Sequence, residues 1–151
     1  MPELIEFISQ FLVDCVSKLS ERGKHQKEAM AEYLANIADT LSKFGPAYKK
    51  QNIEEMTELI SQTDTFAQNF RNVVEGIFRI DEINNFVIQL QNAVSYKDIL
   101  RQKDIMRQKA AAGGEIDTVT PLNDEQLYAI AEISGVFRAN SVNLKAKADR
   151  M

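Results

Sequence analysis

Apolar residues recur at alternating spacings of three and four positions along much of the chain, the spacing that places side chains on one face of an α-helix. The clearest case predicts a helix over residues 24–44, which Gly45 and Pro46 are expected to end. The apolar face of this helix holds Met30, Leu34, Ile37, Leu41 and Phe44. One side of the helix is therefore expected to lie in a core and the other in water.

The N-terminal segment 3–21 is apolar around most of its circumference when it is drawn as a helix. Its apolar residues are Leu4, Ile5, Phe7, Ile8, Phe11, Leu12, Val13, Cys15, Val16 and Leu19. A helix of this kind needs cover on several sides. We expect it to be either the central helix of the domain or part of an interface with a second copy or another chain.

Two capping signatures follow, one at Asn52 and Glu55 and one that begins at Thr65. In such a signature the side chain of the first residue accepts a hydrogen bond from a backbone N–H in the first turn of the helix. The acidic or amide side chain three residues later accepts a hydrogen bond from the backbone N–H of the first residue. They predict helices over residues 53–62 and 65–77, which can also be read as one kinked helix.

The C-terminal part predicts a long helix, a loop and a last helix. Asp81 is expected to cap a helix over residues 81–112 that would be about 48 Å long at about 1.5 Å per residue. Residues 113–122 read as a loop, residues 123–139 as a helix on the same core, and residues 140–151 as a frayed tail.

The predicted fold class is all-α: a single helical bundle of about five or six helices with one long helix extending beyond it. Residues 1–112 form the bundle, which includes the long helix, and the C-terminal helix completes the core. The chain has 151 residues, a length that suits one domain.

Charge and composition narrow the choice of partner. The formal net charge is −4 and the sequence pI is near 5.1, so no nucleic acid is expected as a partner. Cys15 is the single cysteine, which favours a reducing, cytoplasmic location. The most apolar stretch contains Glu6 and Asp14 and is too short to span a membrane. A protein partner, or a second copy of the chain, is the expected class.

Little in the sequence points to catalysis, and no cofactor is expected. His25 is the single histidine and is expected on an exposed helix surface. Glu55 and Glu58 lie one helical turn apart, the spacing with which helical nucleotide pyrophosphohydrolases of the MazG type hold magnesium, so they are the candidate metal ligands. Glu3 and Glu6 have the same spacing, but the further acidic pair that these enzymes need from a facing helix was not found, which favours a solvated acidic face.

A local basic arm lies on the distal part of the predicted long helix. Its residues are Lys97, Arg101, Lys103, Arg107 and Lys109. Only Asp98 and Asp104 oppose them there, whereas residues 1–95 carry more acidic than basic side chains. The arm is a candidate interaction surface, with an ordinary charged helix surface as the alternative.

A resemblance to a known class of modules rests on the segment Ala31-Glu-Tyr-Leu-Ala-Asn-Ile-Ala-Asp-Thr-Leu41. A short capped helix and then helices over residues 66–94 are predicted to follow this segment. Residues 24–94 resemble the small helical-bundle modules of bacterial, often cyanobacterial, multidomain signalling proteins, where they accompany NTPase or protease effector domains. The resemblance implies an adaptor or assembly role without catalytic residues.

Together these features predict a non-catalytic protein–protein interaction or assembly module that self-associates. The contacts are expected through Phe7 and Phe11 of the apolar first helix or through the basic arm. A small helical magnesium-dependent nucleotide hydrolase is the alternative. Reversible membrane association through the N-terminal helix is a third possibility.

Overall fold

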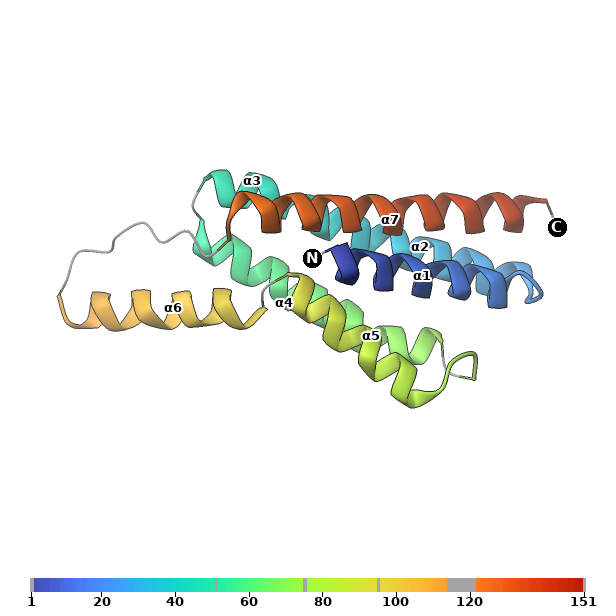
Figure 1. The fold of residues 1–151 in the computed structure, drawn as a ribbon, viewed down its shortest axis with the longest axis horizontal. Helices are drawn as coiled ribbons and strands as arrows, with labels where there is room; N and C mark the ends of the chain where they lie inside the picture. The colour runs from blue at the N-terminus through green and yellow to red at the C-terminus, as the bar shows by residue number, and fades with distance from the viewer. Residues whose placement is uncertain (1, 51, 75, 95, 114–121, 151) are drawn as a thin grey trace.

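The structure is a computed structural model that describes residues 2–50, 52–74, 76–94, 96–113 and 122–150 (Figure 1). Its helices are α1 (Pro2–Leu19), α2 (Lys24–Ser42), α3 (Phe44–Lys49), α4 (Ile53–Val73), α5 (Ile80–Ala93), α6 (Tyr96–Ala111) and α7 (Asp124–Asp149). The predicted all-α bundle is confirmed. Most of the loop predicted at 113–122 lies outside the described residues.

Helices α1, α2 and α7 run along the long axis of the molecule, and α4 and α5 cross beneath them (Figure 1). The predicted apolar seam of α2 is confirmed, because all five of its side chains, from Met30 to Phe44, are buried. The predicted end at residue 44 is two positions late. Helix α2 ends at Ser42, and Gly45 and Pro46 lie in the first turn of α3. A proline is tolerated there because backbone N–H groups in the first turn of a helix have no helical hydrogen-bond partner.

Helix α1 is a central element, packed against α7 and α5. Its fully buried side chains include Ile8, Leu12 and Cys15. Only one side of the helix faces water, where Val13 is 51% exposed. The interpretation of α1 as the central helix therefore holds for most of its apolar surface.

Helix α4 is one continuous helix, so the two separate helices predicted over residues 53–62 and 65–77 are wrong and the alternative of a single helix is nearer to the structure. The backbone N–H of Glu55 donates to Asn52 Oδ1 at 3.0 Å, which confirms the predicted cap. Thr65 is no cap: it lies inside the helix, and its hydroxyl donates to the Ser61 carbonyl at 3.0 Å. A threonine can make this bond within a helix, so the second signature did not require a new start.

The predicted continuous helix over 81–112 is wrong. Helix α5 begins after Arg79, whose backbone N–H donates to the Glu82 carboxylate, and it ends at Ala93. Ala93 and Val94 are buried against the core, and the chain turns there, so α6 runs in a different direction and projects beyond the bundle (Figure 1). The turn places α6 against α4 and α5.

The predicted frayed tail at 140–151 is also wrong, because α7 continues to Asp149. Phe137, Ser141, Leu144 and Ala148 are buried and keep the three-and-four spacing. Two of these positions hold small residues, which an apolar pattern does not mark as core. Small residues let two helices approach closely, and here they pack α7 against α2.

Two serines fix the register of α7 on α2. Ser134 Oγ donates to the Ala38 carbonyl at 2.7 Å, and Ser141 Oγ donates to the Ala31 carbonyl. The pairing order shows that the two helices are antiparallel. Both serines are buried, so each bond satisfies a hydroxyl that would otherwise lack a partner.

Candidate functional site

The residues of the basic arm lie on α6, and their side chains do not all face solvent. Lys103 is only 19% exposed, and its Nζ lies 3.4 Å from Glu54 Oε2 at the start of α4. Arg101, Arg107 and Lys109 are exposed. The side chain of Lys97 lies outside the described residues. Lys103 is therefore an anchor of α6 on the bundle.

A surface hollow lies where α6 meets α4. It has a volume of about 570 Å³ and is lined by Asn52, Glu54, Glu55, Thr57, Glu58, Ser61 and Lys103. The candidate metal ligands Glu55 and Glu58 therefore share one hollow with a lysine. Glu58 is exposed and Glu55 is half-buried at the capped end of α4.

Within the described residues, no group of three or more His, Cys, Asp or Glu side chains is placed to hold a metal ion. Glu54, the third carboxylate of the hollow, is paired with Lys103, so Glu55 and Glu58 remain as the candidate ligands. Mg²⁺ completes such a pair with water and substrate phosphates. Lys103 lies beside them, where an ammonium group could contact a phosphate.

The two phenylalanines predicted at an interface have different surroundings. Phe11 is 8% exposed and stacks on Phe78 and Phe86, with ring centroids 4.6 Å and 4.3 Å apart. It is a core residue, which corrects its expected role in a contact with a partner. Phe7 is half-buried, one turn earlier on α1, and lines a small hollow beside Asp14 and Glu82.

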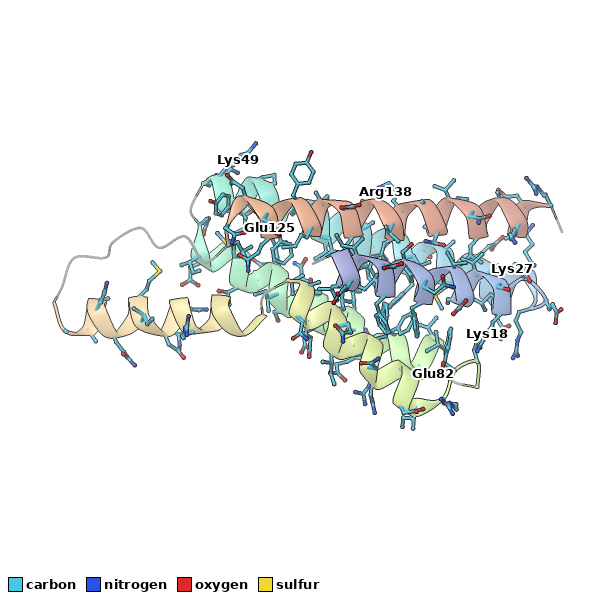
Figure 2. All side chains as sticks on the ribbon, in the orientation of Figure 1. Lys18, Lys27, Lys49, Glu82, Glu125 and Arg138 are labelled. Carbon is cyan, nitrogen blue, oxygen red and sulfur yellow. The ribbon has the colours of Figure 1, made fainter. Side chains whose placement is uncertain are left out.

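The single cysteine is buried and the single histidine is exposed. Burial raises the pKa of the Cys15 thiol to about 12, against a smaller opposite effect of the Lys18 charge, so the thiol is neutral at physiological pH. His25 is exposed on the first turn of α2, as predicted. Lys18 extends toward the segment before α5, where its Nζ lies 4.4 Å from the centre of the Phe78 ring (Figure 2 labels Lys18).

One surface of α7 was not identified in the sequence. Tyr128 is 79% exposed and Val142 is 64% exposed, and both lie on the side of α7 that faces away from α2. Ala131, Gly135 and Ala139, between them, are exposed as well. The signal was present in the spacing of these residues, but the predicted end of the helix at 139 removed Val142 from the pattern.

The fold and these surfaces define the class of the protein as an all-α helical bundle. None of the helices in the described ranges is both long and apolar enough to cross a membrane. Comparisons with protein-family models, curated proteins and solved structures found no match.

Proposed function

We propose that the chain is a non-catalytic protein-interaction and assembly module that uses α6 as a docking helix for an acidic protein surface. The observation that carries the proposal is the position of α6, which is anchored along one side and projects beyond the bundle (Figure 1). The same role is implied by the resemblance of residues 24–94 to adaptor modules.

The anchor is small compared with the length of the helix. Lys103 pairs with Glu54, and Met106 packs against the core, while Arg107 on the next turn is exposed. A helix of 16 residues is only marginally stable without tertiary contacts. A partner that covers the outer side of α6 would therefore stabilise the helix as well as bind to it.

Charge supports an acidic protein as the partner. The whole chain carries a net charge of −4, so it repels polyanions at long range, while α6 offers positive charge locally. A folded protein with a confined acidic patch fits this distribution better than a nucleic acid does. Complementary charge of this kind mainly increases the association rate and the specificity.

The test is quantitative capture of partners from an extract of the source cells, after nuclease treatment, with wild type and two charge-reversal variants. We expect Arg107→Glu to lose a protein that wild type and Arg71→Glu both retain, because Arg71 is an exposed arginine of α4 away from α6. Equal recovery by all three proteins would contradict the role of α6.

A second candidate, a magnesium-dependent nucleotide hydrolase, is supported by the hollow that Glu55 and Glu58 share with Lys103. Isothermal titration with Mg²⁺ and a nucleoside triphosphate tests it. Binding by wild type that disappears in the Glu55→Gln/Glu58→Gln variant would support this candidate, and no binding by wild type would remove it.

Membrane association through α1 stays a prediction. The apolar residues that motivated it lie mostly in the core, so insertion would require α1 to leave its contacts with α7 and α5. Co-sedimentation with anionic vesicles tests this possibility directly.

A further inference from the structure

The outer face of α1 is acidic, and a hollow lies on each side of it. Glu6, Gln10 and Asp14 are exposed on this face, and Val13 is 51% exposed. Helix α1 packs between α7 and α5, so one hollow borders α7 and the other borders α5 (Figure 1). Gln10 lines both hollows, which makes them parts of one surface.

The larger hollow lies between α1 and α7 and has a volume of about 490 Å³. Its lining residues are Ile5, Glu6, Ser9, Gln10, Glu132 and Val136. Ile5 and Val136 are half-buried, whereas the two glutamates are exposed. A surface that combines apolar groups with exposed carboxylates suits long basic side chains, which have an apolar stem and a charged end.

The smaller hollow lies between α1 and α5, has a volume of about 180 Å³, and is lined by Phe7, Gln10, Phe11, Asp14, Glu82 and Asn85. Phe7 is half-buried, and Glu82 is already paired with Arg79, so Asp14 is the main source of free negative charge. Lys18, one turn beyond Asp14, lies over an aromatic ring outside the hollow. A phenylalanine ring beside a carboxylate is a favourable environment for a cation. We call the residues of the two hollows, together with Val13, the acidic face of α1.

The acidic face of α1 differs in charge from two other hollows of the molecule. The hollow on α4 contains Lys103, and the groove between α2 and α7 contains Lys145, whereas no basic side chain of the described residues lines the acidic face. Within the described part of the chain, Glu6, Asp14 and Glu132 make no salt bridge. A basic partner therefore fits this face better than it fits the other two hollows.

A basic segment is present in the chain itself. Of the 18 basic and 22 acidic residues of the whole chain, five basic and two acidic residues lie in α6, which gives this helix a net charge of +3. The remaining 13 basic and 20 acidic residues give the rest of the chain a net charge of −7. Two copies should therefore attract each other most strongly when α6 of one faces an acidic surface of the other.

We propose that the acidic face of α1 binds helix α6 of a second copy of this chain. The inference rests on the proposed function and deepens it, because it identifies the second copy as an acidic partner of α6. The sequence predicted contacts through Phe7 of the first helix or through the basic arm. In the proposed complex these two surfaces bind each other.

The position of α6 makes this a contact between copies. Helix α6 packs against α4 and α5 of its own chain and projects beyond the bundle, away from α1 (Figure 1). Arg107, in the distal half of α6, is exposed and makes no salt bridge with any described residue. Because the two contacting surfaces are different, the association is head-to-tail.

The complex should be transient and sensitive to salt. Helix α6 has 16 residues and is about 24 Å long, so a single helix laid over the acidic face makes a contact of the small, transient class. Salt shortens the range of charge interactions from about 10 Å at 0.1 M to about 3 Å at 1 M. We therefore expect association at about 0.05 M salt and its loss near about 1 M salt. Association that salt leaves unchanged would overturn the role of charge.

Two full-length variants, studied by light scattering in low salt, separate the two surfaces. Arg107→Glu reverses a charge on α6 and keeps the acidic face of α1 intact. Glu6→Lys/Glu132→Lys reverses two charges on the acidic face and keeps α6 intact. All three positions are exposed, so the fold should be retained. We expect each variant alone to associate at least about tenfold more weakly than wild type.

A mixture of the two variants gives the decisive result. The intact α6 of Glu6→Lys/Glu132→Lys can bind the intact acidic face of Arg107→Glu, so mixing should restore association. The complex should contain one copy of each variant and grow no further, because its remaining α6 and its remaining acidic face are both altered. A variant that had lost its fold would not be rescued in this way.

Arg71→Glu and Glu32→Lys are the matched controls, because they reverse exposed charges on α4 and α2. Both should associate as wild type does. A wild type that stays monomeric in low salt would overturn the inference. The inference would equally be overturned if the mixture showed no recovery, or if Glu6→Lys/Glu132→Lys alone associated as strongly as wild type.

These measurements use the purified chain alone, so their failure is distinguishable from failure of the proposed function. If purified copies do not associate but an extract protein is captured through Arg107, the inference is lost and the proposed function stands. If purified copies associate as described but no extract protein depends on Arg107, α6 binds a second copy and the proposed outside partner is lost.

Discussion

Phe11 is the residue around which the aromatic part of the core is arranged. Its ring contacts those of Phe70, Phe78 and Phe86, with ring centroids between 4.3 Å and 5.8 Å from its own. These rings come from α1, α4, α5 and the segment before α5. A single side chain therefore holds together elements that are far apart in the sequence.

The aromatic cluster predicts unequal effects for the two phenylalanines of α1. Replacing Phe11 by alanine should lower the free energy of unfolding by about 3–5 kcal/mol, because it leaves a cavity in the core. Phe7→Ala should lower it by about 1 kcal/mol, because Phe7 is only half-buried. Urea unfolding measures both values, and equal effects would contradict the core position of Phe11.

Cys15 predicts a loss of stability in alkaline solution. Burial raises the pKa of its thiol to about 12, whereas an unfolded cysteine titrates near about 8.5, so the folded state keeps a proton that the unfolded state loses. The free energy of unfolding should therefore fall as pH rises from about 8 to about 10. Burial also raises the pKa of Tyr33, which acts in the same direction at higher pH.

Urea unfolding at several pH values measures this slope, with Cys15→Ala as the control. The slope should be smaller in the control because one of the shifted groups is gone. A slope that is the same in both proteins would show that the thiol does not contribute. The native thiol should also react slowly with a thiol reagent and rapidly once the chain is unfolded.

At the scale of single elements, the antiparallel pair of α2 and α7 is the most closely fitted contact. Ala31 and Ala38 are seven residues apart on α2, and Ser141 and Ser134 are seven residues apart on α7. Matching intervals of two helical turns let both serine hydroxyls reach a carbonyl of the facing helix. Larger side chains at these positions would separate the helices.

The C-terminal half of α7 is expected to contribute strongly to stability. Leu144 is fully buried, so Leu144→Ala should lower the free energy of unfolding by about 2–5 kcal/mol. Val142→Ala, two residues earlier on the exposed side, should change it by less than about 0.5 kcal/mol. Similar small effects for both variants would indicate that residues 140–151 form a frayed tail, as the sequence predicted.

The ion pair between Lys103 and Glu54 should be a weak anchor. Glu54 is 74% exposed, so water and salt screen the interaction. A double-mutant cycle with alanine at both positions should give a coupling of less than about 1 kcal/mol, and added salt should reduce it. A larger, salt-independent coupling would mean that α6 is held more firmly than its contacts indicate.

The sequence predicted elements better than it predicted their ends. The α2 seam and the cap at Asn52 were recognisable, because large apolar residues and cap residues leave a strong local signal. The break at Val94 was missed, because it depends on contacts of α6 with α4 and not on a glycine or proline. The end of α7 was missed, because serine and alanine form its core contacts there.

At the scale of the whole molecule, the sequence also did not predict which candidate site residues lie together. Sequence spacing identified the basic arm and the acidic pair, but only the folded chain brings Lys103 to Glu54 and places Glu58 in the same hollow. It also shows that Phe11 belongs to the core. The exposed apolar residues Tyr128 and Val142 of α7 were missed as one surface because the helix was predicted to end at residue 139.

The helices that form the core differ from the surfaces that are available to a partner. Helix α1 lies inside, packed between α7 and α5, whereas α6 and the outer side of α7 are turned to solvent. A chain that ended near Val94 would lose α7, which supplies part of the core, so truncation would unfold the bundle. Single substitutions on exposed positions are the sharper probes of assembly.

The most direct test of assembly is the molar mass of the full chain, measured by light scattering from about 10 µM to about 1 mM, concentrations that detect dissociation constants in the micromolar to millimolar range. One chain has a mass of 17.1 kDa. We expect the wild-type mass to rise above this value with concentration, because the chain is proposed to be an assembly module. A wild-type mass of one chain at every concentration would contradict self-association.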